Sequence, residues 1–350
     1  MNYIGSKFKL SSFLQANIES TLKDARAKPL KESVFCDIFA GSGVVGKLFK
    51  NTTKQIISND KEYYSFVLNQ NYIANHRKIK GIESLFKELQ DDKLTPPIEG
   101  KIYQNYCMGV ERFLDSNHNL KSNLYKRQYF SDYNGAKIDS IRQKIEQWKR
   151  ENKISPQAYF HLLASLLESA DKVANTASVY GAFLKHLKKS AQKKLILTPA
   201  FFDCNTHSNQ VFNEDSNILI KKIKGNILYL DPPYNNREYG ANYHLLNTIA
   251  LYDDFIPKGK TGLRAYTKST YCKKNEVAKS LESLIQNANF EWIFLSYNDE
   301  GLLSLEQIEN IFSKYGKYSF VTQKYQRFKA DSKRIQKQDS TLEYLHILRK

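Results

Sequence analysis

The stretch Asn226-Ile227-Leu228-Tyr229-Leu230-Asp231-Pro232-Pro233-Tyr234 decides the fold of this chain. Its first half is a short apolar run with β-branched and aromatic members, preceded by Gly225 and followed by two prolines. Such a run is typical of a central strand in a parallel sheet. The prolines fix the backbone φ angle and remove two N–H donors, so the strand must end in an extended turn. Because open α/β sheets bind ligands at the carboxyl ends of their strands, this turn is predicted to line a cleft.

The residues of this turn suit one chemical task, the alkylation of an amino group on a flat ring. The lone pair of such a nitrogen is delocalised into the ring, which makes it a poor nucleophile. The Asp231 carboxylate and the Pro232 carbonyl can each accept one N–H and so free the lone pair, while Tyr234 stacks on the ring. Pro233 stiffens the turn. The simpler alternative is that these residues only end a strand, since turn chemistry alone would accept many residues here.

A second motif, within residues 34–49, predicts a turn that binds a nucleoside. An apolar strand ending at Asp37 leads into Gly41-Ser42-Gly43-Val44-Val45-Gly46, which opens an amphipathic helix. These glycines let the backbone close on a ligand and let the helix pack on the sheet. A further strand, 55–58, ends in Asn59-Asp60, an acidic residue about 20 positions after Gly41, where nucleoside-binding sheets contact ribose hydroxyls.

The class of cofactor stays open on the glycines alone. A phosphate-binding loop is excluded because no Gly-Lys-Ser/Thr ends the turn. NAD fits the glycines, yet hydride transfer gives no reason for the Asp-Pro-Pro-Tyr turn that begins at Asp231. S-adenosyl-L-methionine offers the electrophilic methyl group that the amine geometry requires, so it is the predicted cofactor.

The composition is that of a folded, basic chain of 350 residues. A hydrophobic fraction of 41% is enough for a packed core, and no apolar run approaches the ~20 residues that cross a bilayer. Lys and Arg number 53 against 36 Asp and Glu, a formal charge of +17 that favours nucleic acid as a partner. A lysine-rich proteome would give the same excess, so charge alone does not identify the partner.

The cysteines and the N-terminus bear on the compartment. Cys36, Cys107, Cys204 and Cys272 are widely spaced and include no Cys-x-x-Cys pair, so the sequence predicts neither a disulfide framework nor a zinc or other metal site. The first ten residues mix apolar and charged side chains, unlike a signal peptide. We therefore expect reduced thiols and a cytoplasmic protein.

The α/β pattern is interrupted between the two motifs. A helix at 63–72 is followed, to about residue 198, by helical patterns with high positive charge, including the cluster Lys185, Lys188, Lys189, Lys193 and Lys194. Strand patterns resume at 201–204, 210–216, 291–299, 320–325 and 343–348. This order predicts residues 1–75 and 201–350 as a catalytic domain and residues 76–200 as an inserted, mainly helical domain that recognises DNA.

Two further segments carry expectations about DNA. The Gly/Lys/Thr-rich segment 257–276 is predicted as a loop near DNA phosphates. The aromatic residues Tyr129, Phe130 and Trp148 within the insertion are expected to belong to the local core rather than to stack on bases.

Together these motifs resemble the Dam-like (alpha-group) site-specific DNA adenine-N6 methyltransferases of restriction-modification type. The similar elements follow in the same order: Tyr3-Ile4-Gly5-Ser6-Lys7, Asp37-x-Phe39-x-Gly41-x-Gly43, Asn59-Asp60 and Asp231-Pro232-Pro233-Tyr234. Residues 127–142 and 171–186 also resemble the restriction-modification members. The resemblance implies a Rossmann-like class I methyltransferase fold, in which helices cover both faces of a mostly parallel seven-stranded sheet with one antiparallel strand.

The resemblance also implies roles for individual residues around S-adenosyl-L-methionine. Tyr3 and Lys7 would line its methionine and adenine end, and Tyr3 stands where some relatives carry Trp, which preserves stacking. The cradle would be formed by Phe39, Gly41 and Gly43. Asp60 would bind the ribose hydroxyls, and Asp231 would face both the methionine end and the target amine. Asp215 would contact the adenine amine of the cofactor, although neighbouring Glu214 could serve instead.

The predicted activity is methylation of the N6 amino group of an adenine rotated out of duplex DNA, because an amine inside the stack cannot reach Asp231. The nearest alternative is amino methylation of cytosine N4, an RNA base or a glutamine side chain. Ser or Asn ahead of Pro-Pro-Tyr is commoner in the cytosine and glutamine cases, so Asp231 favours adenine. A DNA-binding protein with a relic pocket would have lost the glycines or the aspartate. The expected partners are double-stranded DNA and a separately acting restriction endonuclease, and the chain is expected to be a monomer.

Overall fold

The computed structural model describes residues 5–75, 77–109, 126–326 and 340–350, and the chain divides into two compact units. One unit contains Arg77–Cys204 and Tyr239–Thr267, and we call it the helical unit. The other contains Gly5–His76, Asn205–Glu238 and Lys268–Lys350, and we call it the sheet unit.

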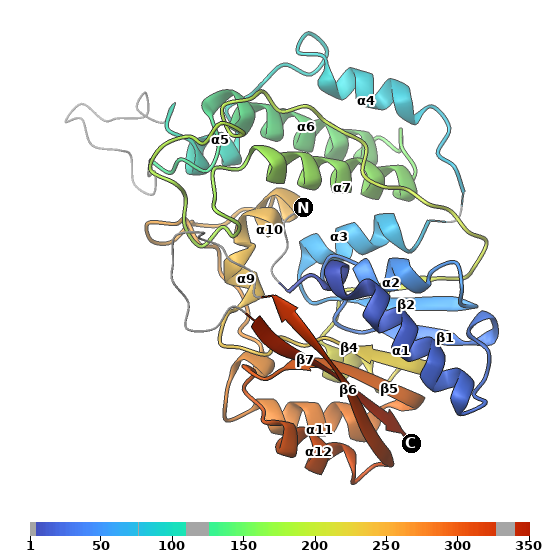
Figure 1. Ribbon diagram of the computed structural model, residues 1–350. Helices are drawn as coiled ribbons and strands as arrows, with labels where there is room; N and C mark the ends of the chain where they lie inside the picture. The colour runs from blue at the N-terminus through green and yellow to red at the C-terminus, as the bar shows by residue number, and fades with distance from the viewer. Residues whose placement is uncertain (1–4, 76, 110–125, 327–339) are drawn as a thin grey trace. The chain divides into compact units, whose positions relative to one another are not determined.

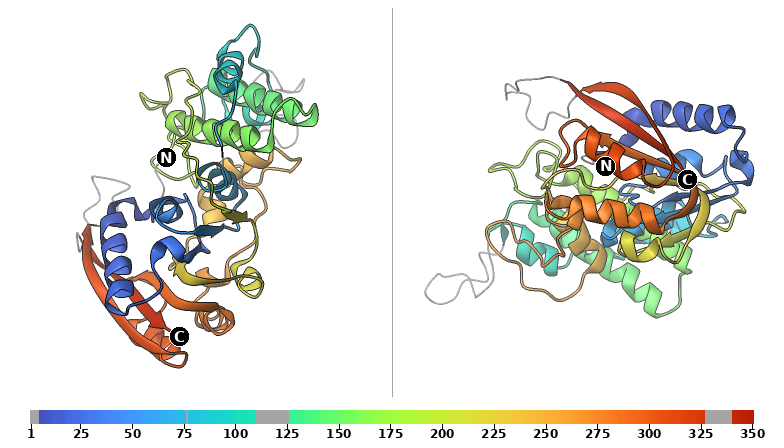
Figure 2. Two further views of the ribbon diagram at one scale, coloured as in Figure 1. Left: turned by 90° about the vertical axis from the view of Figure 1, so that its right-hand side faces the viewer. Right: turned by 90° about the horizontal axis from the view of Figure 1, so that it is seen from below.

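The described part of the sheet unit forms one seven-stranded sheet in the order β3-β2-β1-β4-β5-β7-β6 (Figure 1). The first five strands in this order, β3, β2, β1, β4 and β5, are parallel to their neighbours. Strand β7 is antiparallel to both β5 and β6, and β6 and β7 form a long two-stranded ribbon (Figure 2). The predicted fold class is therefore confirmed. The strands are β1 (Val34–Asp37), β2 (Gln55–Asn59), β3 (Gln210–Phe212), β4 (Lys224–Leu230), β5 (Asn289–Asn298), β6 (Lys317–Gln326) and β7 (Ser340–Arg349).

Helices cover both faces of this sheet. The α-helices of the unit are α1 (Ser11–Asp24), α2 (Val44–Phe49), α3 (Tyr63–Tyr72), α8 (Ser216–Leu219), α11 (Val277–Asn287) and α12 (Leu305–Phe312). Three short 3-10 turns are η1 (Lys7–Leu10), η2 (Leu30–Glu32) and η4 (Thr270–Cys272). The helix predicted at 63–72 is confirmed as α3.

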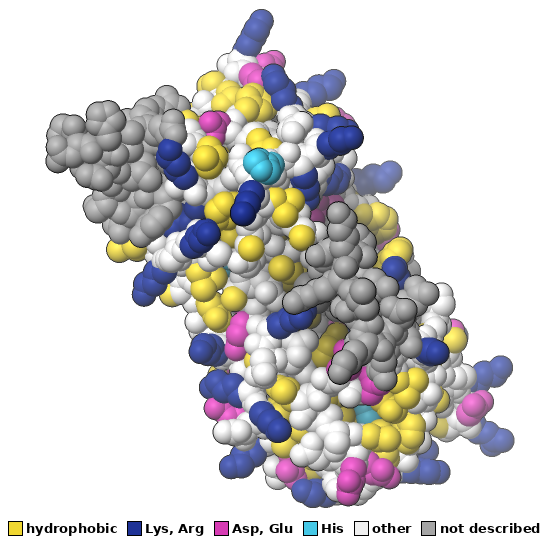
Figure 3. All heavy atoms as spheres, turned by 60° about the vertical axis from the view of Figure 1, so that its left-hand side comes forward, with side chains coloured by type: hydrophobic (Ala, Val, Ile, Leu, Met, Phe, Trp, Pro, Cys, Tyr) yellow, Lys and Arg dark blue, Asp and Glu magenta, His cyan; other side chains and the backbone are white. Residues whose placement is uncertain are grey.

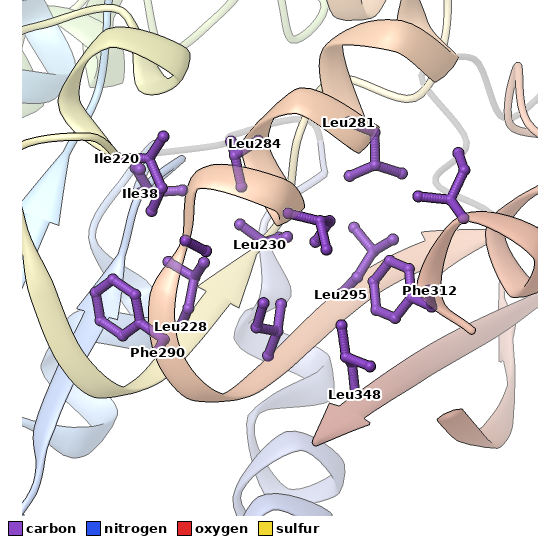
Figure 4. Close-up of a cluster of buried hydrophobic side chains, with 14 of the residues drawn as sticks. Ile38, Ile220, Leu228, Leu230, Leu281, Leu284, Phe290, Leu295, Phe312 and Leu348 are labelled. Carbon is purple, nitrogen blue, oxygen red and sulfur yellow. The ribbon is translucent and has the colours of Figure 1, made fainter. Parts of the chain in front are cut away.

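The central strand β4 is apolar along its whole second half because both of its faces are covered. Leu228 and Leu230 point into a cluster that also contains Leu284 of α11 and Phe312 of α12 (Figure 4). Side chains alternate along a strand, so the buried Tyr229 faces the other side of the sheet. On that side Phe35 of β1 stacks on Phe49 of α2, with ring centroids 4.5 Å apart. Burial on two faces is what the unbroken apolar run in the sequence reflects.

The helical unit is built around α6 (Asp132–Arg150) and α7 (Pro156–Val173), which pack side by side (Figure 1). Each begins with a serine N-cap, Ser131 or Ser155, whose side chain accepts a backbone N–H of the first turn. Tyr129, Phe130 and Trp148 are all buried, which confirms that they belong to the local core. The remaining helices are α4 (Ile82–Gln90), α5 (Lys101–Tyr106), α9 (Tyr239–Asn242) and α10 (His244–Leu251).

The compact units differ from the predicted domain boundaries at 239–267. The sequence assigns this segment to the catalytic part, but in the structure it belongs to the helical unit. The reason lies in α10, which is buried from His244 to Ala250 and therefore needs cover on every side. Arg142 of α6 completes the attachment by donating to the carbonyl oxygens of Ile249 and Ala250 at 3.0 and 3.1 Å.

Two secondary-structure predictions are wrong. Residues 201–204 form no strand, and Phe201 is 60% exposed, so the aromatic pair there does not mark a buried face. Residues 174–198, expected to continue the helical pattern, are irregular. Asn175 explains part of this, because its side chain donates to the carbonyl oxygens of Gln128 and Leu184 and so satisfies the backbone without a helix.

None of the helices in the described ranges combines the length and the apolar character needed to cross a membrane.

Candidate active site

The candidate residues that the structure describes all lie in the sheet unit, along the carboxyl ends of its parallel strands. Strand β1 pairs with β2 on one side and with β4 on the other, so Asp37, Asp60 and Asp231 come from three neighbouring strand ends. We call this set of ends the carboxyl edge. Tyr3, the remaining predicted cofactor residue, lies outside the described residues.

The glycine turn after β1 adopts the backbone that only glycine tolerates well. Gly41 and Gly43 have φ angles of +50° and +73°. Asn69 of α3 holds the turn from below, donating to the Gly41 carbonyl at 3.1 Å and accepting from Ser58 at 2.9 Å. A Cβ at Gly43 would lie 2.7 Å from the Asn69 side-chain oxygen. This role of Asn69 could not be predicted, because a polar residue inside a predicted helix carries no local signal of such a contact.

Asp60 closes the other side of this turn. One of its carboxylate oxygens accepts the backbone N–H of Gly41 at 2.8 Å, and the other accepts that of Glu62 at 2.8 Å. Burial raises the pKa of Asp60 to about 7, against the effect of these two donors, which lower it. Each oxygen keeps a lone pair for a further donor, as a pair of ribose hydroxyls would supply.

Asn59 and Asp215 link the carboxyl edge to the end of β3. The Asn59 amide donates to the carbonyl oxygens of Ile38 and Glu214 at 3.0 and 3.1 Å and accepts the Glu214 N–H at 3.0 Å. Asp215 follows and caps α8 by accepting the N–H of Asn217 at 2.9 Å. Its side chain is 44% exposed and lies 3.8 Å from the ammonium group of Lys61, while that of Glu214 pairs with Lys222.

Phe39 forms an apolar wall beside the glycine turn. Its ring is half-buried and meets Tyr271 edge-on, with centroids 5.0 Å apart. Tyr271 is itself fixed by donating to the Asn217 side chain at 2.8 Å. The wall therefore cannot easily collapse into the space above the turn.

The turn Asp231–Tyr234, which we call the catalytic corner, presents two acceptors. Lys7 binds Oδ1 of Asp231 at 2.9 Å, and among the described residues no donor reaches Oδ2. Likewise, no donor within the described ranges reaches the carbonyl oxygen of Pro232. Two consecutive residues thus offer one acceptor each, which matches the two N–H groups of an amino substituent.

Tyr234 is braced at the rim of this corner. Its carbonyl oxygen accepts the Leu302 N–H at 2.9 Å, and Pro233 before it is half-buried. Its ring meets Tyr297 of β5 edge-on at 6.0 Å, and Tyr297 in turn accepts the Leu303 N–H at 3.2 Å. The ring is half-buried, and its aromatic face is of the kind that stacks on a base.

Lys7 is buried between the catalytic corner and the last part of the sheet. Its ammonium group lies 2.9 Å from Asp231 and 3.2 Å from Glu343 of β7, and its side chain is 4% exposed. Burial works to lower the pKa of Lys7, but the two carboxylates outweigh it and raise that pKa well above the usual value. The contact of Glu343 could not be predicted, since a single acidic residue in an edge hairpin gives no sign of its partner.

Among the described residues, acidic side chains outnumber basic ones at the carboxyl edge. Asp37 is buried, and no donor in the described part of the chain reaches its Oδ1. Burial raises the pKa of Asp37 well above its usual value, and repulsion from Asp231 and Asp60 adds to the effect. Burial also raises the pKa of Asp231, although Lys7 opposes this. Within the described ranges no three His, Cys, Asp or Glu side chains are placed to hold a metal ion. An organic cation would relieve this excess of negative charge.

A glycine turn, an acidic residue at the next strand and an Asp-Pro-Pro-Tyr corner on one parallel sheet define a nucleotide-base amino methyltransferase. The profile of the D12 class N6 adenine-specific DNA methyltransferase family matches residues 3–311. The chain belongs to this family, and its substrate is DNA. The resemblance that the motifs indicated is confirmed, and adenine N6 is favoured over the cytosine, RNA and glutamine alternatives.

Three relatives illustrate the relationship. Type II methyltransferase M.NlaIII of Neisseria lactamica is 55% identical over 100% of this chain and 99% of its own length. Type II methyltransferase M.CviAII of Paramecium bursaria Chlorella virus 1 is 38% identical over 94% of this chain and 93% of its own. Type II methyltransferase M.FokI of Planomicrobium okeanokoites is 39% identical over 100% of this chain, which spans only 53% of that relative.

The substitution Gly43→Ala tests the glycine turn. The added Cβ would strain a left-handed backbone by about 1–2 kcal/mol and press on Asn69, so binding of the predicted cofactor S-adenosyl-L-methionine should weaken about tenfold. Isothermal titration measures this affinity. Gly181→Ala is the matched control, because a Cβ there meets nothing within 4 Å, and its affinity should equal that of the wild type. Unchanged binding by the Gly43 variant would remove this turn from the cofactor site.

Proposed function

We propose that this chain transfers the methyl group of S-adenosyl-L-methionine to the N6 amino group of an adenine within a short specific sequence of duplex DNA. The observation that carries the proposal is the pair of acceptors in the catalytic corner, Oδ2 of Asp231 and the carbonyl oxygen of Pro232. An exocyclic amine that donates one N–H to each is held with its lone pair directed away from them. Such an arrangement requires the base to leave the DNA stack, because a paired adenine uses one of those N–H groups.

The side chains around the corner support this reaction. Tyr234 offers a braced ring face on which the extruded adenine can stack, which offsets part of the cost of unstacking, a few kcal/mol. Asp231 remains an acceptor throughout and does not need to remove a proton, because the methylated amine is acidic enough to lose one to water.

The carboxyl edge fits a positively charged methyl donor. When bound, S-adenosyl-L-methionine supplies an electrophilic methyl group on a cationic sulfur. Three carboxylates, those of Asp37, Asp60 and Asp231, have pKa values raised by burial, and a cation beside them would favour their ionised forms. The excess of acid at this edge therefore supports a cationic ligand over a neutral or anionic one.

The residues proposed to hold the donor are those that the family motifs indicate. Asp60 accepts the ribose hydroxyls, and Gly41 and Gly43 let the backbone approach the nucleoside while Phe39 walls it. Asp215 reaches the adenine amine, and Lys7 with Tyr3 lines the remaining side. This assignment is supported by the positive φ angles of the turn and by the spare lone pairs of Asp60.

We also propose that the helical unit binds the DNA and recognises its sequence. Lys and Arg side chains are spread over the face shown in Figure 3 rather than gathered in one patch, so net charge alone does not locate the contact. The segment predicted to lie near phosphates, residues 257–276, includes a tight turn closed by paired hydrogen bonds of 2.9 Å between Lys258 and Leu263.

The buried guanidinium group of Arg127 stabilises this turn. Arg127, which is 0% exposed, donates to the carbonyl oxygens of Gly259 and Lys260 at 3.0 and 3.2 Å, and Tyr106 donates to that of Gly262 at 2.7 Å. With its carbonyls turned inward, the turn exposes the side chains of Lys258 and Lys260. Within the described residues neither lysine has an acidic partner, which suits contact with a phosphate.

The names of the relatives support a restriction-modification context. We propose that the chain acts as a monomer on double-stranded DNA, protecting sites that a separate endonuclease of the same specificity would cut. Methylation of one adenine at a time requires only one carboxyl edge.

Asp231→Asn tests the catalytic corner. The amide keeps the shape but replaces one acceptor oxygen with a donor, so the rate of methyl transfer should fall at least about 10²-fold, the scale seen when one preorganised hydrogen bond is lost. Single-turnover transfer of a labelled methyl group, followed by mass spectrometry of the nucleosides, measures it. Binding of duplex DNA should change less than about threefold. A variant that forms N6-methyladenine at the wild-type rate would refute the role of Asp231.

Asp60→Asn tests the ribose contact through pH. Because the pKa of Asp60 is raised to about 7, its ionised, accepting form is populated as pH rises through that value. Affinity for S-adenosyl-L-methionine should therefore increase about tenfold between about pH 6 and about pH 8 in the wild type. The asparagine variant should bind weakly and lack this increase. Asp254→Asn, an exposed position with a lowered pKa, is the control and should keep the wild-type profile. Equal profiles in all three proteins would contradict the assignment.

Lys260→Ala tests the DNA contact of the turn. Loss of one phosphate contact should weaken DNA binding about threefold to tenfold and reduce the slope of log affinity against log salt by about one, with no change in cofactor affinity. Fluorescence anisotropy at several salt concentrations measures both quantities. Lys314→Ala removes the same charge from the sheet unit, where Lys314 pairs with Glu282 at 2.8 Å, and is expected to keep the wild-type slope. If the two variants behave alike, the turn is not a contact.

A further inference from the structure

The ammonium group of Lys7 lies between two carboxylates, 2.9 Å from Oδ1 of Asp231 and 3.2 Å from Oε1 of Glu343. Glu343 is 4% exposed and lies at the start of β7, opposite Asn298 of β5. Burying a second carboxylate beside one lysine is costly, so stability alone gives no reason for an acid at this position.

The charges of the three groups do not cancel. Lys7 and Asp231 alone would form a neutral pair, and the Glu343 carboxylate brings the cluster to a net charge of minus one. Methyl transfer moves positive charge onto the amine that Asp231 holds, since the amine lone pair forms the new bond to carbon while the carbon–sulfur bond breaks toward sulfur. A net negative corner favours this shift, whereas a neutral one does not.

We propose that Glu343 is a positioning residue for methyl transfer: it draws Lys7 toward β7, leaves one oxygen of Asp231 for the amine, and keeps the catalytic corner negative. This role rests on the proposed function. It differs from that of Asp231, because Glu343 acts through Lys7 and does not itself contact the reacting atoms.

The geometry around Lys7 supports the positioning role. The ammonium group also lies 5.5 Å from the centroid of the Tyr234 ring, so it sits under the ring proposed to carry the adenine. Without a second carboxylate, Lys7 could bind both oxygens of Asp231 and occupy the acceptor that the amine requires. Glu343 is far from Lys7 along the chain, and the pairing of β7 with β5 and β6 holds it in the sheet.

Several other titratable groups act on this cluster. Burial raises the pKa of Glu343, with smaller contributions from Asp231 and Asp299, while Lys7 opposes the increase. The other ionisable groups that act on the cluster are Asp37, Tyr229 and Tyr234. Removing the charge of Glu343 removes one repelling carboxylate and should therefore lower the pKa of Asp231. The enzyme should then lose activity through protonation of Asp231 only at a lower pH.

Glu343→Gln tests the proposal by equilibrium binding as well as by rate. The wild type should bind S-adenosyl-L-methionine, which has a cationic sulfur, more tightly than S-adenosylhomocysteine, whose sulfur is uncharged. In the variant the ratio of the two affinities should fall about tenfold. This is the scale expected for one unit charge several ångströms away at an effective dielectric constant near 20. Affinity for S-adenosylhomocysteine should change less than about twofold. The single-turnover rate should fall about tenfold, and its acidic limb should move to lower pH.

Two further variants separate charge from structure. Glu343→Asp keeps the charge with a shorter reach, so its ligand preference should stay near that of the wild type while its rate falls. Glu291→Gln makes the same change on β5, at the opposite end of the sheet, where Glu291 pairs with Arg349 at 3.4 Å, and should match the wild type in every measurement.

The outcomes distinguish this proposal from the proposed function. If the wild type neither binds S-adenosyl-L-methionine nor forms N6-methyladenine, the proposed function fails. If the wild type does both, and Glu343→Gln weakens the two ligands equally or leaves the acidic limb in place, then Glu343 is only structural and the inference fails. Loss of the preference in Glu343→Asp to the same extent would also overturn it.

Discussion

The pairing of β1 with β4 is the constraint on which the site depends. The two strands lie 192 positions apart at the contact between the Val34 N–H and the Asn226 side chain, which are 2.9 Å apart. Their parallel register sets Asp37 beside Tyr229, so the glycine turn and the catalytic corner leave the sheet next to each other. Because all the parallel strands point the same way, every loop that matters for chemistry emerges at one edge.

The electrostatics of that edge follow from the same pairing. Parallel strands that end in acids bring those acids together, and burial then raises their pKa values instead of letting water neutralise the repulsion. The buried ammonium group of Lys7 offsets part of this charge. Such an edge is poorly suited to a phosphate and better suited to a cationic ligand.

In the helical unit, buried polar side chains bind backbone groups that lie outside regular hydrogen-bonded structure. Arg127 and Arg142 use their guanidinium donors on backbone carbonyls, which fixes the 258–263 turn and the end of α10. Asp139 of α6 does the converse, accepting the N–H groups of Ile102 and Tyr103 at the start of α5. Side chains that satisfy backbone groups in this way let long irregular segments stay ordered without strands or helices.

The features that depend on local chemistry could be predicted from the amino-acid sequence. The unbroken apolar run of β4, the prolines that end it and the glycines after β1 each carry a backbone requirement that few residues meet, so the fold class, the central strand and the family could be predicted. The tertiary structure alone decided which distant side chains meet: Asn69 under Gly41, Glu343 beside Lys7, and residues 239–267 in the helical unit. Such contacts depend on strand pairing and helix burial across long separations, and a single polar or apolar residue looks the same in the sequence whether or not it has a partner.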